Sequence, residues 1–334
     1  MKVAVTGATG HVGANLVPAL VQRGDDVRVL VHDNDAPLEG LDVERLRGDV
    51  RDAGSLRRVF EGVNVVFHLA AIISIDGDRH GLVRSVNVDG ARNAARAALE
   101  AGVDRMVHFC SVHAFDQSPL DQPLDETRAR VPDERGRPAY DRSKAAGERG
   151  VREVIAEGLD AVILHPTGIV GPGDHEPSRM GRVLLDLYHR SLPSLVHGGF
   201  DWVDVRDVVQ SALSAADRGR TGESYLLSGR WGSVAEVAAL ACEATGVRPP
   251  RLTAPQWLAR VGAPFTTAWG RITGREPLYT AESLAALRAN RHIVCDKAAA
   301  ELGHTPRPLR ASIRDAYAWF AELGKLPAGA VIGS

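Results

Sequence analysis

The chain has 334 residues, of which 44% are hydrophobic and 25% are charged, and its formal net charge is −2. A chain of this kind can bury a large core as a soluble globular protein, and so small a charge gives no field that would attract nucleic acid or an anionic membrane. No apolar run approaches the ~18 residues of a membrane span, and the chain enters an apolar strand at once, so we expect no signal peptide. We therefore expect a cytoplasmic protein.

The three cysteines, Cys110, Cys242 and Cys295, are far apart and form no C-x-x-C motif. This spacing argues against a zinc site and against a disulfide framework. Reduced thiols fit a cytosolic enzyme best, and we expect no metal.

Short apolar runs alternate with helical patterns through the first half of the chain. The alternation predicts an α/β fold in which a doubly wound parallel sheet has helices on both faces. The predicted strands are Lys2–Thr6, Val27–Val31, Val43–Arg47, Asn64–Leu69, Arg105–Ser111 and Ala161–His165. The predicted helices are Val12–Arg23, Ala53–Phe60, Asn87–Glu100 and Ser143–Glu157.

A glycine-rich turn with G-x-x-G-x-x-G spacing follows the first strand and opens the first helix. Glycines permit a tight turn and let backbone N–H groups approach a pyrophosphate, which the N-terminus of the helix then faces. The spacing therefore predicts that a dinucleotide lies on Gly7, Thr9, Gly10, His11, Val12 and Gly13.

The choice of dinucleotide depends on the residues that follow the second and third strands. His32 is placed to meet the 2′-phosphate of NADP and Asp33 to meet the ribose 2′-hydroxyl of NAD. Both can equally be solvated loop residues. Asp49 and Val50 are candidates to contact the adenine, although Asp49 can instead cap the next helix.

Tyr140 is followed four residues later by Lys144. Residues i and i+4 lie on one face of a helix, and a neighbouring ammonium group lowers the pKa of a phenol. The pair predicts a general acid/base that works near neutral pH. An exposed tyrosine beside a solvated lysine is the alternative, so the surrounding motifs decide.

The alternation ends after about residue 170, where Pro and Gly punctuate Gly171-Pro172-Gly173-Asp174. We assign residues 1–170, with a return segment at about 195–217, to a dinucleotide-binding Rossmann domain. Residues 171–194 and 218–326 are expected to form a smaller, mostly helical substrate-binding cap. Residues 327–334 are expected to be a flexible tail.

The ordered set of motifs resembles the extended short-chain dehydrogenases/reductases over most of the chain. The set comprises the glycine turn, Gly48-Asp49-Val50, His68-Leu69-Ala70-Ala71, Asn87-Val88-Asp89-Gly90, Ser111, Tyr140-x-x-x-Lys144 and Gly171-Pro172-Gly173-Asp174. The resemblance implies an NAD(P)(H)-dependent enzyme in which Tyr140 moves the substrate proton, Lys144 holds the nicotinamide ribose and Ser111 hydrogen-bonds the substrate oxygen. Ser111 can otherwise be a strand-end serine that satisfies a backbone group.

The resemblance also implies further contacts along the cofactor, with Asn87 more structural than chemical. These contacts are Leu69, Ala70, Ala71, Asn87, Pro166, Thr167, Gly168 and Ile169. A cation often stands at the place of His32 in the dihydroflavonol reductase-like branch, which favours NADP(H) over NAD(H) and leaves NAD open.

Two branches of the family compete. Nucleotide-sugar epimerases and dehydratases typically carry an Asn and an Arg for the diphosphate where this chain has Gly168 and Phe200. A buried diphosphate without these partners is expensive. The chain is therefore more similar to the dihydroflavonol reductase-like and 3β-hydroxysteroid dehydrogenase-like branch, which interconverts ketones or aldehydes and secondary alcohols. A dinucleotide-binding sensor without turnover is a second alternative.

The substrate is expected to be a largely apolar small molecule. Candidate contacts are Val112, His113, Thr167, Met180 and Trp202. His113 can bind substrate or relay protons, and a neutral, hydrogen-bonded loop histidine is an equal alternative. Trp202 can equally belong to the core. Family members often dimerise through the helices that carry Asn87 and Tyr140, so both a monomer and a homodimer remain open.

Overall fold

The fold is described from a computed structural model, for residues 1–332 except 76, 79, 135, 256 and 258–279. Residues 258–279 of the expected cap, and the last two residues of the expected tail, lie outside the described part.

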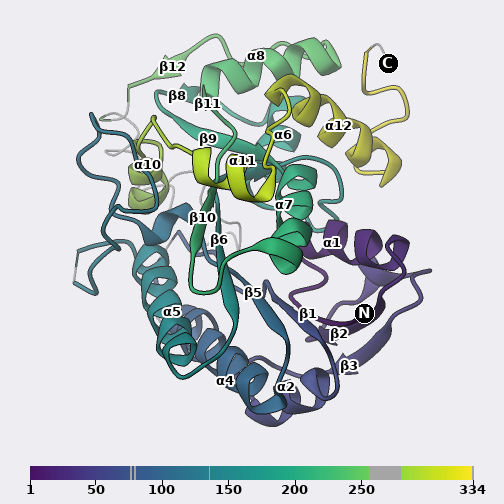
Figure 1. Ribbon diagram of the computed structural model, residues 1–334. Helices are drawn as coiled ribbons and strands as arrows, with labels where there is room; N and C mark the ends of the chain where they lie inside the picture. Colours follow the sequence, from purple (N-terminus) through teal and green to yellow (C-terminus); the bar gives the residue numbers. More distant parts are fainter. Residues whose placement is uncertain (76, 79, 135, 256, 258–279, 333–334) are drawn as a thin grey trace.

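A seven-stranded parallel sheet forms the centre of the N-terminal part (Figure 1). Its strand order is β10-β6-β5-β4-β1-β2-β3, so the direction of winding reverses between β1 and β4. The strands are β1 (Lys2–Thr6), β2 (Asp26–Val31), β3 (Glu44–Arg47), β4 (Val65–His68), β5 (Arg105–Phe109), β6 (Ala161–Pro166) and β10 (Ser224–Leu227). The expected Rossmann-type α/β fold is confirmed.

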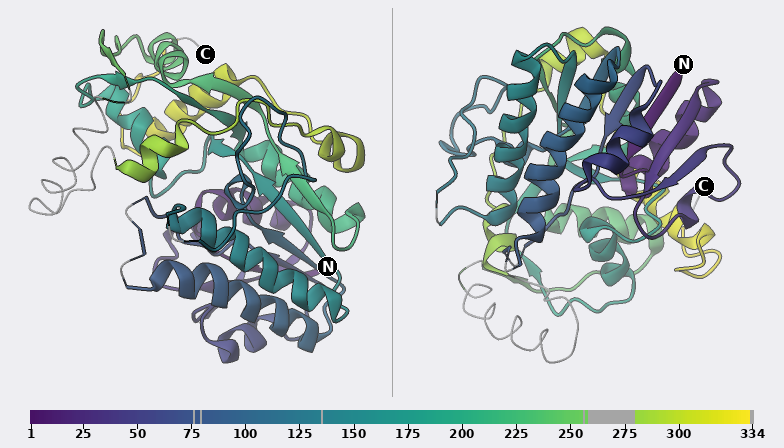
Figure 2. Two further views of the ribbon diagram at one scale, coloured as in Figure 1. Left: turned by 90° about the vertical axis from the view of Figure 1, so that its left-hand side faces the viewer. Right: turned by 90° about the horizontal axis from the view of Figure 1, so that it is seen from below.

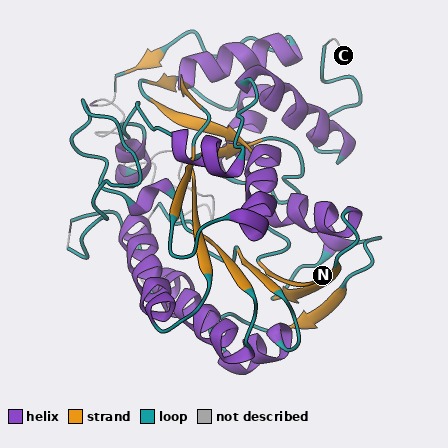
Figure 3. Ribbon diagram, in the orientation of Figure 1, coloured by secondary structure: helices purple, strands orange, loops and turns teal. Residues whose placement is uncertain are grey.

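Helices cover both faces of this sheet, as Figure 3 shows with strands in orange and helices in purple. Alternate side chains of β1 point to opposite faces, and Val3 and Val5 join one apolar cluster while Ala4 joins the other. One face is covered by α1 (His11–Gln22), α7 (Val205–Arg218) and α11 (Asp296–Leu302). The other is covered by α2 (Ala53–Phe60), α4 (Ala91–Ala101) and α5 (Ala139–Ala156).

A cap with its own apolar core lies above the sheet domain in the left view of Figure 2. It contains a three-stranded sheet with the order β11-β9-β7 and a two-stranded sheet in which β8 pairs with β12. Its elements are β7 (Gly168–Val170), β8 (Leu195–Val196), β9 (Gly199–Asp204), β11 (Arg230–Ser233), β12 (Thr253–Ala254), α6 (Arg179–Tyr188), α8 (Val234–Thr245), α10 (Ala281–Ala286) and α12 (Leu309–Glu322).

Two parts of the chain differ from the domain boundaries that were expected from the sequence. Strand β10 pairs with β6 and α11 packs beside it, so both belong to the sheet domain although they fall within the expected cap range 218–326. The segment 327–332 packs against the cap: Ala330 is buried, and Ile332 N–H donates to Ala244 O at 2.7 Å. Apolar side chains near the C-terminus explain this packing, which argues against a flexible tail for these six residues.

Three local boundaries also differ from the expectation, and each bears on the site. The predicted helix Asn87–Glu100 is preceded by Leu82–Arg84 (α3) and begins with a π-helical segment, Ser85–Gly90. Strand β5 ends at Phe109, and Ser111 is an extended residue before a short 3₁₀ turn. Helix α5 begins at Ala139 after Pro138, so Tyr140 and Lys144 both lie on it.

Helix α5 approaches the π-helical segment so closely that Gly147 leaves no room for a side chain. A Cβ atom there would lie 2.2 Å from Asn87 O. We expect Gly147→Ala to lower the free energy of unfolding by roughly 1–3 kcal/mol through overpacking. Urea denaturation measures the change.

Gly150, one turn later on the same helix, is the matched control. A Cβ there would meet only the flexible Arg92 side chain, at 3.3 Å. Gly150→Ala should be neutral or stabilise the helix by up to ~1 kcal/mol. Equal effects of the two substitutions would contradict the close contact at Gly147.

Candidate active site

The glycine-rich turn lies at the point where the winding of the sheet reverses, which is where doubly wound sheets bind nucleotides. Gly7 has a φ of +70°, and a Cβ atom there would lie 2.7 Å from Ala70 N, which follows β4. Gly10 precedes α1 without a side chain that could cap it, so the N-terminal N–H groups of the helix can face an anion. This cradle fits a dinucleotide pyrophosphate.

The end of the site where an adenosine would lie carries both signs of charge. His32 Nδ1 is 2.6 Å from Asp33 Oδ2, and His32 Nε2 is 3.3 Å from Asp49 Oδ2. Arg51 pairs with Asp49 and holds the pKa of that carboxyl at about 2. Arg47 donates to the backbone oxygen of Asp33 at 2.5 Å. His32 therefore lies between two carboxylates and close to two guanidinium groups.

Ser111, Tyr140 and Lys144 come together where β5 ends against α5. Tyr140 hydrogen-bonds with the Ser111 side chain. Lys144 is 5% exposed, and its Nζ donates to Phe109 O at 2.9 Å. The 3₁₀ turn fixes Ser111 Oγ, which accepts from His113 N–H at 3.2 Å. The three side chains named from the sequence thus share one small region.

The electrostatics of this region differ from the expectation for Tyr140. Burial raises the pKa of the Tyr140 phenol, and the hydrogen bond with Ser111 only partly opposes this effect. Burial lowers the pKa of Lys144, while Cys110 and Glu148 oppose the change. The expected lowering of the Tyr140 pKa by Lys144 is not seen, because the ammonium group is directed at Phe109 O. Tyr140 is therefore a protonated phenol, and hence a proton donor, at neutral pH.

His113 lies beside Tyr140 and is held by a neighbouring carboxylate. Its Nδ1 is 3.0 Å from Asp141 Oδ1, and its ring meets that of Tyr140 edge to face at 5.5 Å between centroids. Both His113 and Asp141 are partly exposed. The His113 imidazole is therefore paired with a polar neighbour, as expected for a hydrogen-bonded loop histidine, and it also lies next to the Tyr140 phenol.

Asn87 ties the segment after β4 to α5. Its Oδ1 accepts from Ile72 N–H at 2.8 Å, and its Nδ2 donates to Ile72 O and to Ser143 Oγ at 2.9 Å each. The Asn87 amide thus holds Ile72, and with it the preceding residues Leu69, Ala70 and Ala71, in place.

Three of the residues expected to contact the substrate lie in apolar cores. Trp202 is 6% exposed and its Nε1 donates to Gly232 O at 3.0 Å, so it belongs to the core of the cap. Val112 is buried with Phe115 and Leu226, and Met180 packs on the cap core. Of the two alternatives for Trp202, the core position is the one that the structure has.

Thr167 joins the sheet domain to the cap. Its hydroxyl donates to Asp201 Oδ1 at 2.7 Å, and Gly229 N–H donates to the same oxygen at 2.8 Å. Three other residues that were expected to contact the cofactor flank Thr167. Pro166 is the last residue of β6, and Gly168 and Ile169 lie on β7.

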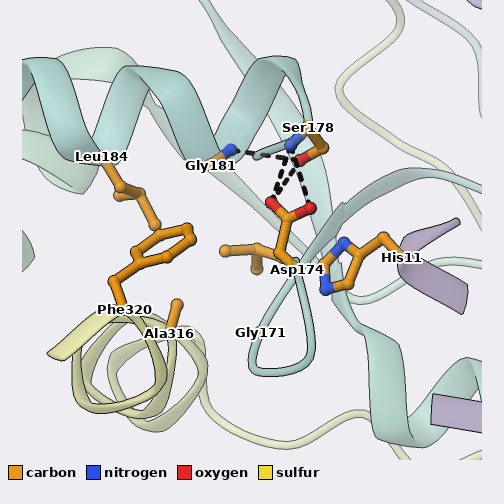
Figure 4. A pocket seen from close by; sticks show the side chains of 9 residues that line it. His11, Gly171, Asp174, Ser178, Gly181, Leu184, Ala316 and Phe320 are labelled. Carbon is orange, nitrogen blue, oxygen red and sulfur yellow. Dashed lines mark hydrogen bonds between the residues drawn. The ribbon is translucent and has the colours of Figure 1, made fainter. Parts of the chain in front are cut away.

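A narrow gap without room for a water molecule lies between the glycine turn and the cap (Figure 4). His11 lines it, and His11 Nε2 is 3.0 Å from Pro172 O. The Asp174 carboxylate accepts from Ser178 N–H at 2.9 Å. Ligand pockets usually measure ~300–1,000 Å³, so a gap that cannot hold a water molecule is a feature of packing at the junction and not a substrate site. His11 holds the loop through its side chain.

A buried polar network beneath α5 was not predicted from the sequence. Glu148, one helical turn after Lys144, accepts from Arg130 Nε and Arg152 Nε at 2.8–3.0 Å. His165, at the end of β6, lies between Ser111 O and Ser224 Oγ. The sequence does carry one sign of this network: Lys144, Glu148 and Arg152 are spaced four residues apart on one predicted helix.

The fold, the glycine turn and the Ser–Tyr–Lys set together define an enzyme of the dinucleotide-binding type. A model of the NAD dependent epimerase/dehydratase family matches residues 3–228. The chain belongs to this family, and it is an extended short-chain dehydrogenase/reductase. The sequence-based recognition of this family is confirmed, as is the branch related to dihydroflavonol and 3β-hydroxysteroid enzymes.

The chain is similar over its whole length to known proteins. It is 40% identical over 333 residues to sterol demethylase protein B of Methylococcus capsulatus, covering 98% of this chain and 100% of that protein. It is 29% identical over 330 residues, 92% of each chain, to 4-hydroxy-2-methyl-3-oxo-4-farnesyl-3,4-dihydroquinoline-1-oxide ketoreductase of Stigmatella aurantiaca. The crystal structure of gox2253 superposes with a TM-score of 0.84 at 33% identity, covering 97% of this chain and 99% of that one.

Among the helices that the structure describes, we find none that combines the length and the apolar character needed to cross a membrane.

Asp201, at the junction between the sheet domain and the cap, should make the stability of the protein depend on pH. Burial raises the pKa of Asp201 to about 6, against the opposing effect of its hydrogen bonds from Gly229 and Thr167. In the unfolded chain the Asp201 carboxyl ionises near pH ~4. The stability that protonated Asp201 contributes to the wild type is therefore lost as the pH rises from about 4 to about 6. Asp201→Asn keeps an oxygen for both donors and should be more stable at pH 7 by about 1–3 kcal/mol.

Unfolding curves at pH 4, 5, 6, 7 and 8 measure this gain, which should grow up to pH ~6 and then level off. Asp121→Asn, at an exposed site, is the control and should show no such growth. An advantage for Asp201→Asn that is the same at every pH would contradict the raised pKa.

Proposed function

We propose that the protein is an NAD(P)(H)-dependent oxidoreductase that interconverts a ketone or aldehyde and a secondary alcohol on a largely apolar small molecule. The observation that carries the proposal is the meeting of Ser111, Tyr140 and Lys144 past the end of β5, at the sheet edge where the glycine turn follows β1. When bound, the nicotinamide supplies or accepts a hydride at the substrate carbon.

The chain's own groups would handle the oxygen and its proton. Ser111 and Tyr140 would hydrogen-bond the substrate oxygen, and Tyr140 would give its proton to that oxygen as the alcohol forms. Burial raises the pKa of the Tyr140 phenol, so this proton is held on the phenol of the free protein at neutral pH. Lys144 would hold the nicotinamide ribose. The similarity to a protein named as a ketoreductase supports the same chemistry.

A polycyclic, sterol-like substrate is the class we favour, because of the 40% identity to a protein named for sterol demethylation. We further propose that the enzyme works in the cytoplasm, as a monomer or homodimer.

The competing proposal is a nucleotide-sugar epimerase or dehydratase with the same catalytic groups. The residues at the place of the diphosphate argue against it. A Cβ atom at Gly168 would lie 2.9 Å from Asp201 O, so an asparagine does not fit there without movement. Phe200 packs edge to face on Trp202 and offers no charge. Tight binding of UDP or dTDP in calorimetry would favour the epimerase, and cofactor binding without turnover of any ketone, alcohol or aldehyde would favour a sensor.

Tyr140→Phe tests the mechanism. Loss of the acid/base should reduce turnover by ~10²–10⁴-fold, while affinity for NADPH and NADH stays close to that of the wild type. The assay follows NAD(P)H oxidation with a panel of steroid ketones, flavanones and quinones. Tyr188→Phe, on the cap helix α6, is the matched control and should keep full turnover. Wild-type turnover in Tyr140→Phe would refute the mechanism.

For the dinucleotide we propose NADP(H) over NAD(H), with His32 as the partner of the 2′-phosphate. His32→Ala should lower the ratio of kcat/KM for NADPH to that for NADH by roughly tenfold, as expected for about 1.4 kcal/mol of lost contact. Asp33→Asn should raise the same ratio, because a negative charge near the phosphate is removed. A wild-type ratio below one would assign the site to NAD, and a ratio unchanged in both variants would show that neither His32 nor Asp33 determines the preference.

A further inference from the structure

We propose that His165 is a positioning residue that fixes Ser111 through its main-chain oxygen; this inference rests on the proposed function. His165 is fully buried at the end of β6. Its Nδ1 lies 3.1 Å from Ser111 O and its Nε2 lies 3.0 Å from Ser224 Oγ. Phe115 packs edge to face on the ring at 4.7 Å, so the imidazole is held on three sides.

The hydrogen bonds of Ser224 determine which nitrogen of His165 carries the proton. Arg130 Nη2 and Arg152 Nη2 lie 3.0 and 2.7 Å from Ser224 Oγ, and a guanidinium group can only donate. A hydroxyl has two lone pairs and one proton. Both lone pairs accept from the arginines, so the proton is donated to His165 Nε2. The Nδ1 atom therefore bears the hydrogen and donates to Ser111 O.

The His165 imidazole is neutral because it is buried. Burial lowers the pKa of His165 to about 4, although Glu148, whose Oε2 is 3.8 Å from Nε2, opposes the shift. Burial favours a raised pKa for Glu148, but its interactions with His165, Arg130 and Arg152 hold that pKa at about 2. The network thus presents one directed series of donors, from the arginines through Ser224 and His165 to Ser111.

The bond to Ser111 O bears on catalysis because Ser111 lies just past the end of β5. The described strand pairing of β5 with β6 stops at Phe109, and the last backbone bond is Cys110 N–H to Leu164 O at 2.8 Å. His165 extends this link by one residue with a side chain. Ser111 Oγ must face both Tyr140 and a substrate oxygen, and a shift of ~1 Å at such a group can cost ~10²-fold in rate.

Metal binding is the other reading of this cluster, because Cys110, Glu148 and His165 are the group of metal-type ligands that comes together among the described residues. The hydrogen bonds argue against it. The lone pair of His165 Nε2 accepts from Ser224, Glu148 is paired with two arginines, and burial raises the pKa of the Cys110 thiol to about 12. Two guanidinium groups beside the carboxylate would also repel a cation.

The tautomer is testable without a substrate. A long-range ¹H–¹⁵N correlation spectrum of the full-length protein at pH 7 should show a neutral His165 protonated on Nδ1. The His165→Asn variant identifies the signal by its loss. A proton on Nε2, or a doubly protonated ring, would overturn the inference.

Kinetics test the positioning role, using the ketone that is turned over fastest in the panel described for Tyr140→Phe. His165→Leu should lower kcat by roughly 10–100-fold with NADPH affinity unchanged. His165→Asn keeps a donor near the position of Nδ1 and should recover most of kcat, whereas His165→Gln, whose amide lies nearer the Nε2 position, should not.

His304→Leu is the matched control. His304 is also buried, and its ring nitrogens lie 2.8 Å from Ser211 Oγ and 2.7 Å from Ser228 O, away from Ser111. This substitution should cost similar stability and leave kcat unchanged. If His304→Leu lowers kcat as much as His165→Leu, the effect is structural and the inference fails.

A double-mutant cycle with Ser111→Ala separates the remaining possibilities. If His165 acts through Ser111, His165→Leu should lower kcat no further in the Ser111→Ala background. An equal further loss would overturn the inference. Loss of turnover in Tyr140→Phe together with full turnover in His165→Leu would refute the positioning role alone, whereas full turnover in Tyr140→Phe would refute the proposed function itself.

Discussion

The arrangement of the candidate active site depends on one constraint, the burial of the Lys144 ammonium group between α5 and the sheet. A buried charge is costly unless it is paired and hydrogen-bonded. Phe109 O supplies the hydrogen bond, and Glu148 supplies a negative charge one helical turn away. Glu148 is buried in turn and requires Arg130 and Arg152. A single lysine therefore accounts for a network that reaches the surface, where both arginines are partly exposed.

The same constraint explains why α5 lies so close to its neighbours. Gly147 lets the helix contact the π-helical segment at Asn87 O, and Asn87 holds both Ser143 and the segment after β4. The wall of the cofactor site and the helix that carries Tyr140 and Lys144 are thus joined by one side chain. A helix placed farther from the sheet would leave Lys144 short of Phe109 O, so tight packing and electrostatics act together here.

Much of the fold and part of the candidate site could be predicted from the sequence. The buried parallel strands are apolar runs, the glycine turn is local, and the Tyr140–Lys144 spacing is a helical repeat, so each can be read from neighbouring residues. The seventh strand could not be assigned, because Ser224–Leu227 joins β6 only in three dimensions. His165 and Ser224 are 59 residues apart and show no shared pattern. The pKa of Tyr140 also escaped prediction, because burial raises it and Lys144 Nζ is directed at Phe109 O instead of the phenol.

The cap shows how a fold shared with nucleotide-sugar enzymes can favour another kind of substrate. Strand β7 pairs with β9, which brings Asp201 O against Gly168 and leaves no space for a polar side chain at that position. On β9 the next residue, Trp202, turns its indole into the cap core and is fixed by Gly232 O, while Phe200 packs against it. Both positions that would meet a diphosphate are therefore used for packing. Because Thr167 and Gly229 bind Asp201 from the sheet domain, this apolar arrangement is tied to the edge of the sheet where Ser111, Tyr140 and Lys144 lie. This packing fits the proposed substrate, with one polar oxygen and an otherwise apolar body, better than it fits a charged nucleotide.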